Sequence, residues 1–330
     1  MTVRSKTQVL KAFAAGLALL FAPLSLNADD ASPVEWLKGM CDAMQNQSYT
    51  GTFVYLHGNS MESMRVVRRH TDAGSDEKLV SLNGEPREIL RRNNVVTQIL
   101  PKLGVVTVNK ARVRSQLPLS VPMEIDGIER YYQLSLEGVE RVAGRRCQVL
   151  SLKPRDSYRY GHRLWIDESS RLLIKSDLLD TQGDVLEQIM YTELEVSPQL
   201  TDAMFEPEFD TAGLKRRELG HADQQQLLMS DHQWRVSRAP QGFMLTTHER
   251  RGASESAAVE HMVYSDGMAT VSVFVEPLAK GENMPVEGHS RMGALNAYGR
   301  VQGSHKVVVV GEVPAATVKQ LSESVEARSQ

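Results

Sequence analysis

Six arginines are the side chains whose type and spacing most clearly suit ligand chemistry. They are Arg65, Arg68, Arg69, Arg87, Arg91 and Arg92. The strands that carry them become neighbours if Asn83-Gly84 forms the hairpin that this dipeptide favours. Because the arginine fork suits phosphate or carboxylate, we predict Arg65, Arg87 and Arg91 as an anion-binding set. The alternative is pairing with nearby acids, since like charges this close repel one another. Those acids are Glu62, Asp76, Glu85 and Glu88.

No other set of polar residues forms a convincing catalytic or metal-binding motif. The nine histidines are scattered, with no HExxH motif and no pair at a helical spacing that suits zinc. Residues 288–293 resemble a nucleophile elbow, but the second glycine comes one residue late and no buried parallel strand precedes it. A phosphate-binding GK[ST] loop and a dinucleotide fingerprint are also missing. We therefore expect a binding protein rather than an enzyme, with no metal and no cofactor.

Cys41 and Cys147 are the two cysteines of the chain. In an oxidising compartment they could form a disulfide, and closing so long a loop would contribute about 4 kcal/mol in the chain-entropy model. The equal alternative is two buried free thiols, because sequence does not supply the distance between them. Two cysteines this far apart form neither a redox nor a zinc motif.

The first 28 residues have the pattern of a secretory signal peptide. Arg4, Lys6 and Lys11 form a positive start, residues 12–22 form an apolar core, and Ala28 is a small residue at the cleavage point. A core of about ten residues is too short to span a bilayer, although an uncleaved anchor is the alternative. Removal of the signal takes the net charge from −3 to −6, because its three cations are lost. Mild acidity argues against nucleic-acid binding, and the remaining length favours two domains.

A helix and then a long series of strands must position these residues. The helix begins at Ser32-Pro33, because serine suits the cap and proline the first position. Apolar residues then alternate with a period of two, which predicts an antiparallel meander. Its predicted strands are 49–57, 64–70, 78–83, 85–92, 95–100, 104–108, 138–144 and 146–152, followed by three strands between Tyr160 and Tyr191. Asn93-Asn94 is a further turn candidate.

Residues 110–137 interrupt this strand pattern. The stretch LPLSVP contains two prolines, which exclude a central strand, and residues 128–136 have a helical pattern. We predict a long loop followed by a helix that lies over the sheet. Loops of this length in compact domains are often functional.

Composition divides the exported chain into two domains. Residues 206–231 are polar and predict a linker between a large domain, 29–205, and a small one, 232–330. In the small domain, Asp266-Gly267 predicts a hairpin within 261–277. Residues 306–310 predict a further strand, and 314–327 predict a terminal helix. The small domain is thus expected to be α+β.

Apolar alternation gives the first sheet an inner face that needs a cover. Its candidate residues are Phe53, Tyr55, Met64, Val66, Leu164 and Ile166. In an exported protein without a catalytic motif, such a face suggests a groove that holds a lipid. A fully packed core is the alternative interpretation.

Several stretches of the chain resemble the MucB/RseB family of periplasmic negative regulators of the envelope-stress sigma factor. They are PREILRR (86–92), RYGHRLWIDESSRLLIKSDLLDTQGDVLEQ (159–188), APQGF (239–243), VYSDGM (263–268) and VVVVGEVPAATVKQLSE (307–323). The resemblance runs from the first helix to the last and includes both domains. The first domain alone also resembles the lipoprotein carrier LolA.

The resemblance implies an α+β fold with two parts. The first is an eleven-stranded, half-open antiparallel β-barrel of the LolA type with covering helices, and the second is a small α+β domain. It also implies a periplasmic location and binding to the periplasmic part of a MucA/RseA-type anti-sigma factor. Such binding would shield the anti-sigma factor from the first regulatory protease, and lipid or lipopolysaccharide in the large domain would loosen the complex.

The resemblance implies that the second domain, with help from the linker, forms the anti-sigma interface. Apolar residues that fit such an interface are Phe243, Tyr264, Met268 and Phe274, although core packing is the alternative role for each. Lipopolysaccharide phosphates would meet Arg65, Arg87 or Arg91. A lipid or lipoprotein carrier is the alternative function, but a carrier of the LolA type needs only the half barrel. The sequence leaves the oligomeric state, including a homo-oligomer, open.

Overall fold

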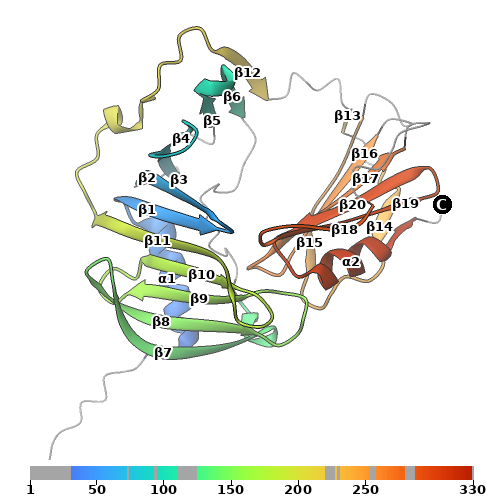
Figure 1. Ribbon diagram of the computed structural model, residues 1–330, viewed down its shortest axis with the longest axis horizontal. Helices are drawn as coiled ribbons and strands as arrows, with labels where there is room; N and C mark the ends of the chain where they lie inside the picture. Colours follow the sequence, from blue (N-terminus) through green and yellow to red (C-terminus); the bar gives the residue numbers. More distant parts are fainter. Residues whose placement is uncertain are drawn as a thin grey trace, which may run out of the picture. The chain divides into compact units, whose positions relative to one another are not determined.

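The computed structural model describes most of the chain beyond the predicted signal. The described residues are 31–72, 74–92, 95–109, 125–219, 227–228, 231–252, 258–278 and 287–328. The predicted signal, the Asn93-Asn94 turn and residues 110–124 of the predicted loop lie outside these ranges. Ser32–Gln330 form one compact unit. Its described part contains a large sheet, a smaller sheet and two α-helices (Figure 1).

The first sheet has twelve strands in the order β12-β6-β5-β4-β3-β2-β1-β11-β10-β9-β8-β7 (Figure 1). They are β1 (Tyr49–His57), β2 (Ser60–Thr71), β3 (Gly74–Ser81), β4 (Glu88–Arg92), β5 (Val95–Leu100), β6 (Val105–Asn109), β7 (Tyr132–Val142), β8 (Arg145–Pro154), β9 (Gly161–Asp167), β10 (Leu173–Leu179), β11 (Val185–Val196) and β12 (Lys215–Leu219). The edge strands β7 and β12 do not neighbour each other in this order, so the described sheet is half-open rather than a closed barrel. This confirms the expected architecture, and the predicted meander supplies eleven of the strands.

The twelfth strand comes from the segment that the sequence predicts as a linker. Strand β12 pairs in parallel with β6, whereas the other neighbours in this sheet are antiparallel. The residues before it cross the sheet: the short helix η3 (Asp202–Phe205) is followed by Phe209 and Leu214, which pack on a cluster formed by β4, β5 and β6. Thus residues 206–219 contact the first sheet.

Helix α1 (Pro33–Asn46) begins where the sequence predicts. Ser32 and Glu35 form a capping box, each side chain accepting a hydrogen bond from the other residue's backbone N–H. Leu37, Met40 and Met44 are buried on one side of the helix at the expected spacing. Because α1 contacts β7 and β8, it covers part of the first sheet (Figure 1).

The predicted helix at 128–136 is wrong. The structure has only a single 3-10 turn, η2 (Ile128–Arg130), and then β7. From Tyr132 the burial alternates with a period of two, since Tyr132 is buried, Gln133 is exposed and Leu134 is half-buried. Pairing of β7 with β8 along its whole length outweighs the short helical pattern of the sequence.

The second sheet has seven strands in the order β13-β15-β16-β17-β20-β19-β18. They are β13 (Leu227–Leu228), β15 (Met244–Gly252), β16 (Val259–Ser265), β17 (Thr270–Pro277), β18 (Gly288–Met292), β19 (Leu295–Gln302) and β20 (His305–Gly311). The predicted hairpin on Asp266-Gly267 is confirmed as β16–β17, with Gly267 at φ 98°. Strands β18 and β19 are not predicted from the sequence, and β18 includes most of the elbow-like residues.

A helix and a short strand pair complete the second domain. Helix α2 (Ala315–Glu323) contacts β17, β19 and β20, and its Val318 and Leu321 join the apolar core. The predicted terminal helix is too long, because β14 (Trp234–Val236) pairs with β21 (Val325–Ala327). Among the helices of the described residues, none is long and apolar enough to cross a membrane.

Candidate functional site

Strand register places the six predicted lipid-contacting residues on one face of the first sheet. Phe53 lies directly opposite Met64. Tyr55 lies opposite Ile189, and the same row continues across β10 to Leu164. Val66 and Ile166 lie two residues further along β2 and β9, so they share this face. We call Phe53, Tyr55, Met64, Val66, Leu164 and Ile166 the apolar face.

Most of the apolar face is covered. Five of its six residues are at most 3% exposed, and Tyr55 is half-buried. Tyr191 packs edge-on against Phe53 at 5.6 Å between ring centroids. The C-terminal end of α1 is held against the same face of the first sheet by Arg68, which donates a hydrogen bond of 2.9 Å to the carbonyl of Gln45. A lipid chain would therefore reach these side chains only after a covering element moves.

Acidic groups surround Tyr55, the most accessible residue of the apolar face. Its hydroxyl donates a 2.7 Å hydrogen bond to Glu187, and its ring stacks on His57. Burial and the hydrogen bond to Glu187 raise the pKa of Tyr55. Burial and the charge of Glu187 also raise the pKa of Glu312. The surroundings of Tyr55 are therefore rich in carboxyl groups.

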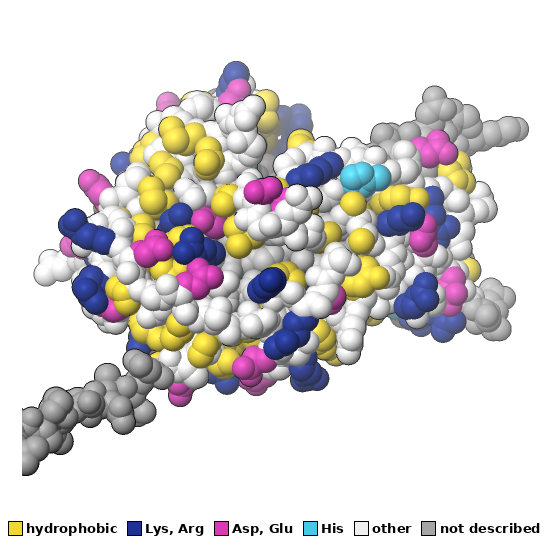
Figure 2. Space-filling view, turned by 60° about the horizontal axis from the view of Figure 1, so that its bottom comes forward, with side chains coloured by type: hydrophobic (Ala, Val, Ile, Leu, Met, Phe, Trp, Pro, Cys, Tyr) yellow, Lys and Arg dark blue, Asp and Glu magenta, His cyan; other side chains and the backbone are white. Residues whose placement is uncertain are grey.

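The three arginines predicted as an anion site do not converge. Arg65 follows Met64 in β2, so it points to the opposite face, where it pairs with Glu208 at 2.5 Å. Arg87 pairs with Glu62, and Arg91 lies 3.8 Å from a carboxylate oxygen of Glu77. Figure 2 shows the same mixing, with basic side chains beside acidic ones on the face drawn. The arrangement resembles the alternative interpretation, and the anion site stays a prediction.

Cys41 and Cys147 are both buried and carry free thiols in the structure. Cys41 lies on the buried side of α1, and Cys147 lies in β8. Burial raises the pKa of Cys41 to about 12 and that of Cys147 to about 11. Such thiols are poor nucleophiles at neutral pH. The structure thus corresponds to the second of the two alternatives that the sequence leaves open.

The four candidates for a partner interface fall into two groups. Phe243 and Tyr264 belong to the buried core under α2, where they are 5% and 7% exposed. Phe274 lies on the other face of the second sheet, half-buried and stacked on His261 at 4.3 Å. Met268 is half-buried in the β16–β17 turn. Phe274 and Met268 are thus the two that a partner could contact directly.

Arg159 is a functional candidate that the sequence interpretation missed. Its side chain is completely buried and donates hydrogen bonds to Asp266 at 2.9 Å and to the carbonyl of Gln241 at 2.6 Å. The aromatic rings of Tyr131, Tyr132 and Phe243 surround the guanidinium. The hydroxyl of Tyr132 also donates to Asp266. This buried network joins the loop after β8 to the β16–β17 turn.

Comparison with known families identifies both parts of the chain. Residues 32–209 match the MucB/RseB N-terminal domain, and residues 229–326 match the MucB/RseB C-terminal domain. The sigma-E factor regulatory protein RseB of Haemophilus influenzae is 29% identical over 322 residues, which is 97% of this chain and 98% of the relative. The sigma factor AlgU regulatory protein MucB of Pseudomonas aeruginosa is 31% identical over 317 residues, covering 94% and 95%.

A solved structure gives the same result at the level of the fold. In the complex of MucA and MucB from Pseudomonas aeruginosa, a chain matches with a TM-score of 0.71 and 27% identity, covering 91% of this chain and all of that one. The match therefore extends into both sheets. The chain belongs to the MucB/RseB family.

Proposed function

We propose that this protein is a periplasmic regulator of an envelope-stress sigma factor, and that it binds the periplasmic domain of a MucA-type anti-sigma factor. One observation carries the proposal: similarity to MucB and RseB regulators extends over both domains and over nearly the whole of a chain from a MucA/MucB complex. Binding would shield the anti-sigma factor from its first regulatory protease. The protein would act by covering the anti-sigma factor and not by catalysing a reaction.

The second sheet is the better candidate for the partner interface. Phe274 lies on the sheet face opposite the α2 core, and its neighbours across the register are His261 and Val308. Both neighbours are half-buried, so this face offers apolar area without being sealed by a helix. Aromatic residues on such a surface are common anchors of protein interfaces.

The apolar face of the first sheet is the candidate lipid site. Its six residues share one side of the sheet, and their burial means that lipid entry requires a change in the covering elements. A lipid that binds only the opened state would favour that state. If the anti-sigma factor prefers the covered state, the lipid and the partner would be coupled negatively.

The buried Arg159 network is the candidate route for this coupling. It connects the loop that follows β8 with the β16–β17 turn, which carries Met268. A shift of β8 and β9 during lipid entry would change the position of Arg159. Because a buried arginine has to keep its partners, Asp266 would move with it.

A protease-protection experiment tests the proposal. The periplasmic domain of a MucA-type anti-sigma factor is incubated with its first regulatory protease, with and without this protein, and the intact fraction is followed over time. We expect cleavage to slow when the protein is present, and to recover when lipopolysaccharide is added. Unchanged cleavage in both mixtures would refute the regulator. Protection that lipid leaves unaltered would keep the regulator and refute the lipid switch.

A matched pair of variants tests the lipid site. Tyr55→Ala removes the half-buried aromatic ring from the apolar face, whereas Leu56→Ala changes the next residue, which is 42% exposed and points to the other face. We expect Tyr55→Ala to weaken lipid binding about 10-fold and Leu56→Ala to leave it unchanged. Equal binding by both variants would contradict the assignment. Lipid uptake without any binding of the anti-sigma factor would favour a carrier.

A further inference from the structure

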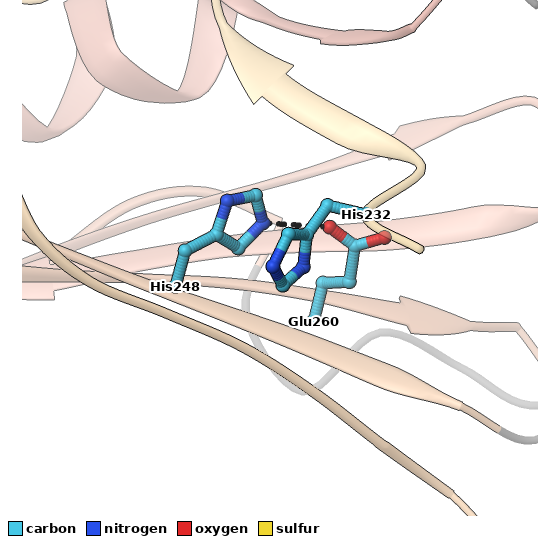
Figure 3. A group of neighbouring side chains, drawn as sticks. All are labelled: His232, His248 and Glu260. Atoms are coloured by element: carbon cyan, nitrogen blue, oxygen red, sulfur yellow. Dashed lines mark hydrogen bonds and ion pairs between the residues drawn. The ribbon is translucent and has the colours of Figure 1, made fainter. Parts of the chain in front are cut away.

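Three side chains with metal-ligand chemistry converge beside the second sheet. His248 comes from β15, Glu260 from β16, and His232 lies two residues before β14 (Figure 3). One ligand atom of each residue lies within 4.8 Å of those of the other two. Two histidines and one glutamate are a donor set that zinc uses in sites with three protein ligands and one open position.

Glu260 is held with one carboxylate oxygen toward the imidazoles. The side chain is 2% exposed, and its Oε1 accepts a 2.5 Å hydrogen bond from the backbone N–H of Gln233. Its Oε2 accepts from the N–H of Trp234 at 3.2 Å and lies 2.8 Å from Nε2 of His248. Backbone groups thus fix the orientation of the carboxylate, as groups around a metal ligand do. The Oε2 atom is thus the one that faces His248.

His232 places a second imidazole beside that of His248, and one of its ring nitrogens has no hydrogen-bond partner among the described residues. Its ring stacks on that of His248 with 3.8 Å between centroids and 18° between planes (Figure 3). Its Nδ1 atom is buried and has no hydrogen-bond partner among the described residues. A buried nitrogen without a partner costs free energy.

We propose that His232, His248 and Glu260 bind one Zn²⁺ ion, with water in the fourth position. The ion would replace the hydrogen bond between His248 and Glu260. Ligand atoms at about 2.0–2.2 Å from zinc are about 3.4 Å apart in a tetrahedron, so no pair has to approach by more than about 1.4 Å. Arg250 lies 3.8 Å from Oε1 of Glu260 and would remain beside that oxygen, away from the ion.

The ion would connect the first residues of the second domain to the second sheet. His232 lies two residues before β14, whereas His248 and Glu260 lie in the paired strands β15 and β16. A shared ion would therefore connect the chain that enters the domain with an interior strand pair. Because metal binding to the folded state adds to its stability, the second domain should resist unfolding better when zinc is present. This inference does not depend on the proposed regulatory function.

Zinc titration of the untagged chain from residue 29 onward tests the site. The protein is first treated with EDTA and dialysed, and ZnCl₂ is then added in a calorimeter at pH 7.5. We expect one ion per chain with a Kd of about 10 µM or tighter. We also expect the Tm to rise by about 5 °C at a zinc concentration 100 times the Kd. No saturable binding would overturn the proposal.

Single variants locate the bound ion. His232→Ala and His248→Ala should each weaken binding at least about 30-fold, whereas His70→Ala, an exposed histidine on β2, should bind like the unmodified chain. Circular dichroism in EDTA checks that each variant is folded. If His248→Ala does not fold, His232→Ala and the visible absorption of bound Co²⁺ decide the outcome. Equal binding by His232→Ala and His70→Ala would place the ion elsewhere and overturn the proposal.

Discussion

Different kinds of chain segment cover the buried faces of the two sheets. Part of the first sheet is covered by residues 206–214, which have only the short turn η3 before them and no helix of their own. These residues are held by charged side chains, since Lys78 donates to the carbonyl of Glu206 and Glu88 accepts from the N–H groups of Glu208 and Phe209. An irregular segment cannot satisfy its own backbone groups, so the sheet has to supply partners.

The second sheet is covered by a helix, which satisfies its own backbone hydrogen bonds. Its core accordingly consists mainly of valines, and α2 adds Val318 and Leu321. The buried charges of this domain include Glu260 and Arg250, which lie beside each other, and Asp266 in the β16–β17 turn. The difference teaches that the irregular segment on the first sheet is anchored by the buried charges of Lys78 and Glu88, whereas the helix on the second sheet packs on a core of valines.

Glu88→Ala should have the largest effect on stability. Glu88 is completely buried, accepts hydrogen bonds from two backbone N–H groups and lies 3.5 Å from the buried ammonium of Lys78. Its loss removes the buried carboxylate beside Lys78, which keeps only the more exposed Glu208 at 3.0 Å, and leaves two backbone N–H groups without their acceptor. We therefore expect the free energy of unfolding to fall by about 4 kcal/mol. Urea denaturation monitored by circular dichroism measures this. A loss below about 1 kcal/mol would mean that the covering segment is not anchored by charge.

Leu321→Ala should destabilise the second domain through lost apolar packing. Leu321 is fully buried in the core under α2. We expect a loss of about 3 kcal/mol, because both the transfer free energy and the cavity contribute. Hydrogen exchange read by mass spectrometry should show faster exchange in β17 and β20 than in the strands of the first sheet. Equal acceleration in both sheets would show that the two domains unfold together.

Acid should weaken the first domain through His162 in β9. Burial lowers the pKa of His162 to about 4, while in the unfolded chain it stays near the usual 6.5. Above pH 6.5 the ring is neutral in both states. As the pH falls from 6.5 toward 4, the unfolded state binds a proton that the folded state does not, so stability decreases by about 3 kcal/mol. His162→Gln should flatten this pH dependence, and an unchanged slope would refute the assignment.

Phe274→Ala should change partner binding and hardly change stability. The ring is half-buried on the face of the second sheet opposite the core. We expect the Kd for the anti-sigma periplasmic domain to rise about 10-fold, which corresponds to about 1.4 kcal/mol. Leu103→Ala, an exposed position next to the first sheet, serves as the control. Equal affinities for the two variants would move the interface away from this face.

Arg146→Ala should have the smallest effect. Arg146 pairs with Glu168 at 2.9 Å, but its side chain is 74% exposed. Exposed pairs contribute little, so we expect a change below about 0.5 kcal/mol in urea denaturation. A loss comparable with that of Glu88→Ala would erase the distinction between anchoring and surface charges in the first sheet.

Sequence periodicity predicts most strands of the first sheet, but it misses β18 and β19 of the second sheet. The alternation at Phe53, Tyr55 and Leu164 places these residues correctly on one side, because a period of two leaves little freedom of register. It fails at 128–136, where a short apolar pattern fits a helix as well as a strand. It also misses β12, since nothing in Lys215-Arg216-Arg217 indicates that β6 supplies a parallel partner.

The polar clusters are harder to predict, because their members meet only through tertiary contacts. Arg159 and Asp266 are 107 residues apart, and Asp266 looks like an ordinary turn residue in the sequence. One signal exists for the histidine cluster. Glu260 precedes Met262 and Tyr264 by two and four positions, so it occupies an inward-facing place in an apolar strand. A charge at such a position requires a buried partner.

Calorimetric titration of the mature chain with the periplasmic domain of a MucA-type anti-sigma factor tests the central claim most directly. The account predicts saturable binding, with affinity that decreases when lipopolysaccharide is present and with a negative heat-capacity change from apolar burial. Absence of binding at protein concentrations up to about 100 µM would mean a Kd too weak for a stable complex, and it would contradict the assignment of this protein as a regulator.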